Sequence, residues 1–115
     1  ALGAFGGGIA GTGRVCGILV GGVALISSIY SRSTIEEKEN PRMWPLSYKF
    51  VKKFEKLTQS FGGVDCHDIA RVDWKNREET KEFYSNPESR RKFCIQLVGD
   101  AAYVLGELLE AEKVS

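Results

Sequence analysis

The fold of this chain is decided by one uncharged stretch, residues 15–31, which reads VCGILVGGVALISSIYS. Arg14 and Arg32 border the stretch, and its side chains are apolar or small almost throughout. A helix that is apolar on nearly every side has to be covered by other elements. Its 17 residues fall below the roughly 20 that a membrane-spanning helix needs. We therefore expect no membrane span, and a buried helix at the centre of a soluble bundle.

Amphipathic segments that can cover this helix follow it along the chain. The clearest has apolar residues at intervals of four, four, three and four: Leu46, Phe50, Phe54, Leu57 and Phe61. No segment longer than four residues alternates apolar with polar side chains, as a half-buried strand does. The sequence therefore predicts an all-α fold, a compact bundle of four to five helices around a central glycine-lined apolar helix.

The later helices are predicted from residues that favour a helix start. Asp65 precedes a short helix over about 66–72, and Asn76 precedes another. The pair Asn86–Pro87 is expected to start the last helix, over about 87–113. Proline is well tolerated at the first position of a helix, because an N–H group at that position has no hydrogen-bond partner within the helix.

Composition points to one ordinary domain and excludes several classes of protein. The chain has 115 residues, of which 43% are apolar, enough for a single core. Sixteen Lys and Arg against fifteen Asp and Glu give a net charge of +1, whereas a dedicated nucleic-acid binder shows a basic excess. Three cysteines are too few for a disulfide-stapled secreted domain. We expect a cytoplasmic location and no nucleic acid among the partners.

Glycine is concentrated at the start of the chain: nine of its thirteen copies lie in the first 22 residues. Residues 3–13 are too rich in glycine for a stable helix and predict a compact loop with close backbone contacts. Residues 6–11 match the dinucleotide pattern G-x-G-x-x-G, but no strand precedes them, so a packing role is favoured over nucleotide binding. The chain opens at Ala1 without a signal peptide, and we expect residues 1–115 to be a single helical domain that lacks an N-terminal helix.

The three cysteines carry the sharpest chemical signal. Cys16 lies near the start of the central helix beside Arg14, and Cys66 directly follows the predicted cap Asp65. Backbone N–H groups and the positive end of a helix stabilise a thiolate, so we expect lowered pKa values, with Cys16 the more acidic. Cys94 lies on the apolar stripe of the last helix, where a buried and weakly reactive thiol is the default. We expect the three side chains to converge.

Glycines and cysteines together make the chain resemble a known family. The stretches FGGGI at 5–9, GRVCG at 13–17 and FGGVDC at 61–66 are similar to the central part of the C-GCAxxG-C-C family of redox-active proteins, and Cys94 matches its last cysteine. The upstream Gly-Cys-Ala motif of that family is absent from this chain. The resemblance covers about residues 5–109, and it implies a small helical protein whose cysteines act in redox chemistry or bind metal.

The leading hypothesis is a thiol-based redox protein in which Cys16, Cys66 and Cys94 exchange electrons between thiol and disulfide. An alternative is a metal- or cofactor-binding module, in which the same cysteines and His67 form a Cys₃His metal site or the cysteines hold an iron–sulfur cluster. A second alternative is a structural helical domain that forms a homodimer through its glycine-lined helix. The redox partner, the substrate and the question of enzymatic activity are left open by the sequence.

Overall fold

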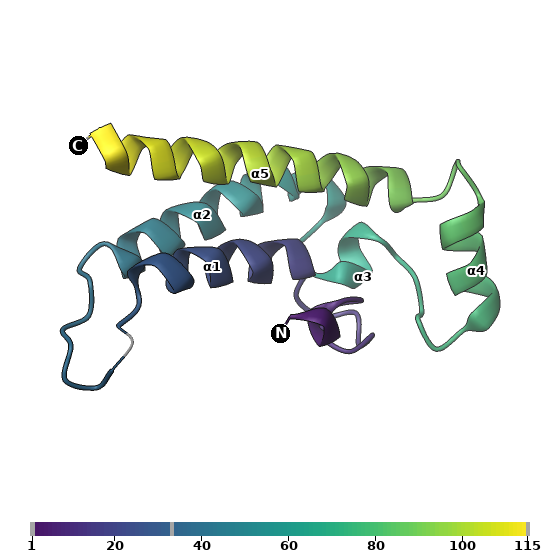
Figure 1. The fold of residues 1–115 in the computed structure, drawn as a ribbon. Helices are drawn as coiled ribbons and strands as arrows, with labels where there is room; N and C mark the ends of the chain where they lie inside the picture. Colours follow the sequence, from purple (N-terminus) through teal and green to yellow (C-terminus); the bar gives the residue numbers. More distant parts are fainter. Residues whose placement is uncertain (1, 33, 115) are drawn as a thin grey trace.

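The computed structural model describes residues 2–32 and 34–114. Within these residues the chain forms five α-helices and no β-strand, which confirms the predicted all-α fold (Figure 1). The helices are α1 (Gly17–Tyr30), α2 (Met43–Leu57), α3 (Cys66–Ile69), α4 (Arg77–Ser85) and α5 (Arg91–Val114), with 3₁₀ turns η1 (Gly3–Phe5) and η2 (Gln59–Phe61).

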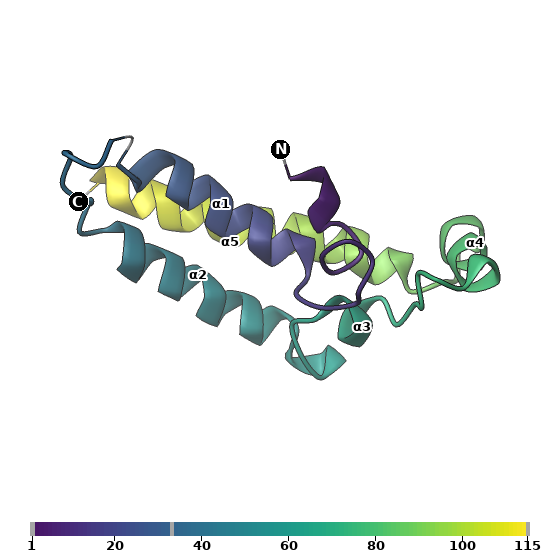
Figure 2. The same cartoon turned by 90° about the horizontal axis from the view of Figure 1, so that it is seen from below.

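Three of the helices, α1, α2 and α5, pack against one another and enclose the core. Figures 1 and 2 show α3 and α4 beyond the end of this bundle where α1 begins. The molecule is elongated, 49 × 28 × 20 Å, because α5 has 24 residues and extends by about 1.5 Å per residue along the bundle. Each of these three helices contacts both of the others, so α1 is not more central than α2 or α5.

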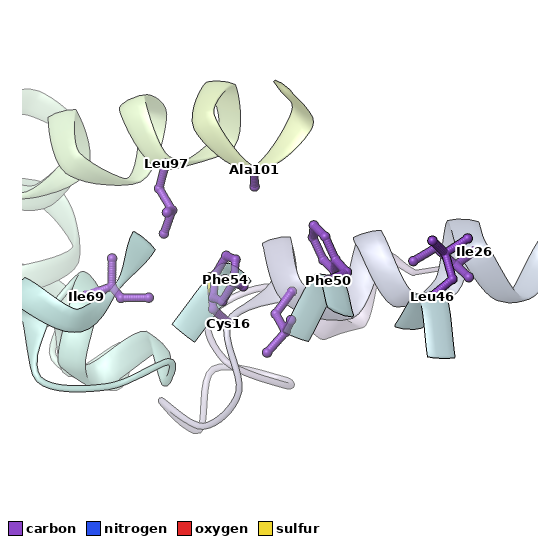
Figure 3. Packing of buried hydrophobic residues seen from close by; sticks show 9 residues of the cluster. Cys16, Ile26, Leu46, Phe50, Phe54, Ile69, Leu97 and Ala101 are labelled. Atoms are coloured by element: carbon purple, nitrogen blue, oxygen red, sulfur yellow. The ribbon is translucent and has the colours of Figure 1, made fainter. Parts of the chain in front are cut away.

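Aromatic side chains of α2 fill the space between the three helices. Phe50 and Phe54, both on the predicted apolar stripe, are buried. Figure 3 shows them in the core, with Leu97 and Ala101 of α5 pointing toward them. Gly22 of α1 provides the room, since a Cβ at this position would collide with the ring of Phe50. At this position the glycine lining of the central helix has a packing role.

One face of α1 is open, contrary to the expectation that the helix is buried on nearly every side. Ile26 is fully buried, but Leu25 is 44% exposed and Ile29 is 52% exposed. The reason is that two neighbouring long helices cover only part of the circumference of a third. No helix within the described residues is both long enough and apolar enough to cross a membrane.

The start of α5 differs from the prediction for a local reason. The helix begins at Arg91 and not at Pro87. Instead, Oδ1 of Asn86 accepts a hydrogen bond from the N–H of Glu88 at 2.9 Å, and its carbonyl oxygen accepts one from the N–H of Ser89 at 3.0 Å. These bonds close a turn around Pro87, because an asparagine side chain competes well with helical hydrogen bonding.

The two short helices follow the predicted start signals more closely. Asn76 caps α4, since its Oδ1 accepts hydrogen bonds from the N–H groups of Glu78 and Glu79. The helix α3 ends at Ile69, earlier than predicted, because Arg71 adopts a left-handed backbone with φ of 55°. A helix of L-residues does not continue through such a position.

Candidate functional site

The glycine-rich segment forms the predicted compact loop with an unusual backbone. Five consecutive residues, 7–11, have φ between 53° and 73°, in the left-handed region. Glycine adopts this region freely, but for Ile9 and Ala10 it costs about 1–2 kcal/mol each. Hydrogen bonds within the loop oppose this cost, among them one from the N–H of Arg14 to the carbonyl oxygen of Gly8 at 2.9 Å. The loop therefore turns back on itself and ends beside the segment that carries the first cysteine.

Gly8 lies where this loop meets the start of α3. A Cβ at Gly8 would lie 2.7 Å from the Cβ of Cys66 and 2.5 Å from the backbone nitrogen of Arg14, so a larger residue does not fit. The carbonyl oxygen of Arg14 accepts a hydrogen bond from the N–H of Cys66 at 2.6 Å, and that of Gly13 accepts one from the N–H of His67 at 3.0 Å. The loop thus holds the start of α3 by its backbone.

A short antiparallel bridge joins the segments that carry Cys16 and Cys66. Val15 pairs with Asp65, and the N–H of Cys16 donates to the carbonyl oxygen of Val64 at 3.1 Å. Each cysteine directly follows one residue of the bridged pair, and Cys66 already begins α3. The bridge brings together two cysteines that are 50 positions apart in the sequence.

Cys16 is the N-cap residue of α1 and is only 8% exposed. Burial raises the pKa of its thiol; the N–H groups of Ile18 and Leu19 act to lower this pKa, and the charge of Cys66 acts to raise it. These N–H groups form no cap hydrogen bond with the Cys16 side chain. The predicted lowering of the pKa is therefore wrong for Cys16, because loss of water around the sulfur outweighs the helix start.

Cys94 packs against the same core from α5. Burial raises the pKa of its thiol to about 11, charges on Cys16 and Cys66 add to the rise, and Arg90 acts in the opposite direction. The charges of Cys16 and Cys66 therefore act on the Cys94 thiol. The raised pKa agrees with the weakly reactive thiol expected at Cys94. All three cysteines are free thiols.

His67 lies beside the two carboxylates at the start of α3. Its side chain is 63% exposed, with Nε2 3.4 Å from Oδ2 of Asp65 and Nδ1 3.5 Å from Oδ1 of Asp68. The two carboxylates also form the capping box of α3, which confirms the predicted cap at Asp65. Among the described residues, these three side chains form a group whose ligand atoms lie within 4.8 Å of one another. That group contains none of the cysteines of the Cys₃His alternative.

Trp74 belongs to this region, although the sequence analysis did not single it out. A Cβ at Gly7 would lie 3.2 Å from Nε1 of the Trp74 indole, so the glycine loop and the ring are in close contact. Nε1 is buried without a hydrogen-bond partner, and the ring meets Phe83 edge-on, with centroids 5.1 Å apart. Together with His67, the loop and the indole border a cavity of about 330 Å³. The sequence did contain a signal for this contact. Trp74 is a large aromatic residue shortly after Cys66, and the glycine loop has almost no side chains of its own with which to form a core.

Comparison with known proteins gives one match. The model of the family C_GCAxxG_C_C, described as "Putative redox-active protein (C_GCAxxG_C_C)", matches residues 1–108. No curated protein and no solved structure matches the chain. The matched range includes the glycine loop and all three cysteines.

Proposed function

The chain belongs to the C_GCAxxG_C_C family, and on this basis we propose that it is a thiol-based redox protein that exchanges electrons through Cys16, Cys66 and Cys94. The observation that supports the proposal is the bridge between Val15 and Asp65, which holds the backbone of Cys16 next to the segment that carries Cys66. Cys94 adds a third thiol, whose pKa responds to charge on the other two.

In the proposed exchange, the thiolate of Cys66 attacks one sulfur of a disulfide on a partner molecule. A mixed disulfide forms, and the other partner sulfur leaves as a thiolate that takes a proton from water. Cys16 then releases its proton, attacks Sγ of Cys66 and displaces the second partner thiolate. After the exchange, Cys16 and Cys66 are joined by a disulfide. The two sulfurs of the partner are reduced to thiols, so two electrons have passed from this chain to the partner.

Exposure supports this order of events. Cys66 is partly exposed, whereas Cys16 is buried at the start of α1. A partner disulfide therefore reaches Cys66 first. The raised pKa of Cys16 keeps its thiol protonated at neutral pH, so it reacts only with a disulfide already held beside it. Cys94 is partly exposed as well, and its thiol pKa of about 11 keeps it protonated at neutral pH.

The proposed location is the cytoplasm, where thiol reductants return protein disulfides to the reduced state. The partner is defined by its chemistry as a disulfide, carried by a protein or by a small molecule.

Reaction of the reduced chain with oxidised glutathione tests the proposal, with the products mapped by peptide mass spectrometry. We expect the native chain to form the Cys16–Cys66 disulfide, and Cys16→Ser to stop at glutathione bound to Cys66. Cys94→Ser is the matched control and should still form the internal disulfide. If Cys66→Ser reacts as fast as the native chain and forms an internal disulfide, the assigned roles are wrong.

The same preparations separate the redox function from the metal-binding alternative. Under anaerobic purification, the redox proposal predicts three alkylatable thiols and less than stoichiometric metal. One bound metal ion per chain, lost on replacement of any of the three cysteines, would instead establish the cysteines as ligands.

A further inference from the structure

Three glycines within helices have no role inside the molecule. At Gly21 of α1, and at Gly99 and Gly106 of α5, an added Cβ would meet nothing within 4 Å. None of the three has a positive φ. Glycine inside a helix is less favourable than alanine by about 1 kcal/mol, so each of these residues weakens its helix without helping the packing of this chain. Gly22, which makes room for Phe50, shows the contrast.

These glycines lie on an apolar face shared by α1 and α5. A groove of about 250 Å³ runs between the two helices, and its lining includes Gly21, Val98, Ala102 and Leu105. Leu25 continues the face along α1 at a spacing of four residues from Gly21, and it is 44% exposed. We call this surface the α1/α5 face. Ile29 extends it on α1, and Ile95, Gly99 and Gly106 extend it on α5.

The charges of α5 make this face complementary to itself. Arg91 and Lys92 lie at the start of the helix, where Lys92 also pairs with Glu88 at 3.3 Å. Near its end, Glu107, Glu110 and Glu112 outnumber the single basic residue, Lys113. Between these groups the residues at helical spacing on the face are uncharged: Ile95, Val98, Gly99, Ala102 and Gly106. Two such helices in antiparallel orientation place the basic start of one beside the acidic end of the other.

We propose that the α1/α5 face binds a second copy of this chain, with the two α5 helices antiparallel across a twofold axis. An axis near residues 100 and 101 sets Gly99 opposite Ala102 and Ile95 opposite Gly106. Small residues thus meet at the crossing point, and a large side chain enters the space above a glycine. A twofold interface uses the same patch on both copies, as this arrangement requires.

The size of the face suits a stable dimer. The 24 residues of α5 extend about 36 Å and the 14 residues of α1 about 21 Å. With helices about 10 Å wide, the outline of the face is roughly 600 Å² per copy, compared with the about 800 Å² of accessible surface that each partner buries in a standard interface. The proposal does not depend on the redox function, because it places none of the cysteines in the contact.

Analytical ultracentrifugation of the whole chain over a range of concentrations tests the dimer. A monomer has a mass of 12.7 kDa, and we expect a concentration-dependent species of twice that mass. Ala102→Lys should give a monomer, because it places a charge at the crossing point. Ala111→Lys is the matched control, since Ala111 is an exposed residue of α5 on another side of the helix, and this variant should remain a dimer.

Gly99→Ala provides a second test, whose expected result cannot be explained by misfolding of the variant. This variant should unfold at a higher urea concentration as a monomer, because alanine favours the helix, and yet dimerise at least about tenfold more weakly. A native chain that stays monomeric at all concentrations would overturn the proposal. So would an Ala102→Lys variant that dimerises like the native chain.

Discussion

At the scale of single residues, Cys16 shows how burial can overcome a helix start. The sequence indicated a nearby Arg14 and the first N–H groups of a helix, and both of these favour a thiolate. It did not indicate that the side chain would be 8% exposed in a core shared with α2 and α5. The loss of water around the Cys16 sulfur depends on elements that are far away in the sequence. Local reasoning therefore gave the wrong direction for the pKa of Cys16.

Cys94 makes the stability of the fold depend on pH in the alkaline range. Its pKa is raised from about 9 to about 11 by folding, so the unfolded chain loses this proton first as the pH rises. The stabilisation is complete below about pH 9 and is lost as the pH approaches 11. We expect the contribution of Cys94 to fall by on the order of 1–2 kcal/mol over this interval.

Urea unfolding of the native chain and of Cys94→Ser, from neutral pH to pH 10.5, measures this effect. Lysines and tyrosines titrate in both proteins, and serine does not titrate, so the difference between the two slopes isolates Cys94. Parallel loss of stability in the two proteins would show that the thiol at position 94 is not the cause.

At the scale of elements, the glycine loop and α3 act as one unit. The carbonyl oxygens of Gly13 and Arg14 in the loop accept hydrogen bonds from the first N–H groups of α3. At Gly8 there is no space for a larger residue between the loop and α3. The sequence analysis correctly predicted a compact loop and a cap at Asp65. It had no means of pairing them, because the pairing is a backbone contact between distant segments that leaves no periodic pattern.

Gly8→Ala tests this unit. The residue has φ of 73° and close contacts with Arg14 and Cys66, so we expect a loss of about 2–4 kcal/mol and faster alkylation of Cys66. Gly62→Ala is the matched control, because Gly62 has φ of 95° and open space around it. It should show only the conformational cost of about 1–2 kcal/mol. Equal losses in the two variants would mean that the contact with α3 contributes nothing.

Helix starts show the same limit of local reasoning. Asn76 caps α4 as predicted, since the side chain reaches the N–H groups two and three residues ahead. Asn86 has the same chemistry, yet it closes a turn before α5. The two outcomes differ because the N–H of Ser89 also donates to the carbonyl oxygen of Asn86, and the Ser89 hydroxyl donates to Phe83. The sequence pattern at the two sites is alike, and these hydrogen bonds of Ser89 decide between cap and turn.

At the scale of the whole molecule, hydrophobic periodicity was sufficient to predict an all-α bundle. The stripe that includes Phe50 and Phe54 is buried, and α1, α2 and α5 each contact the other two. The sequence could not show which side of α1 stays open, because Leu25 and Ile26 are equally apolar. Only the packing of α2 and α5 on the side of Ile26 distinguishes the two, and it leaves the α1/α5 face to the proposed second copy.

The cysteines were candidates from the sequence, but their geometry was not predictable. The bridge between Val15 and Asp65, which two of them directly follow, was visible only in the structure. In the proposed function, this bridge is the reason for taking Cys16 and Cys66 as the exchanging pair, with Cys94 as the third thiol.

The central claim is tested most directly by counting thiols across a redox titration of the whole chain. The chain is equilibrated in buffers of oxidised and reduced dithiothreitol, quenched with acid, alkylated and analysed by mass spectrometry. We predict that two thiols disappear together in one two-electron transition, that the lost pair is Cys16 and Cys66, and that Cys94 remains labelled. Loss of thiols one at a time, with no internal disulfide at any potential, would contradict the account.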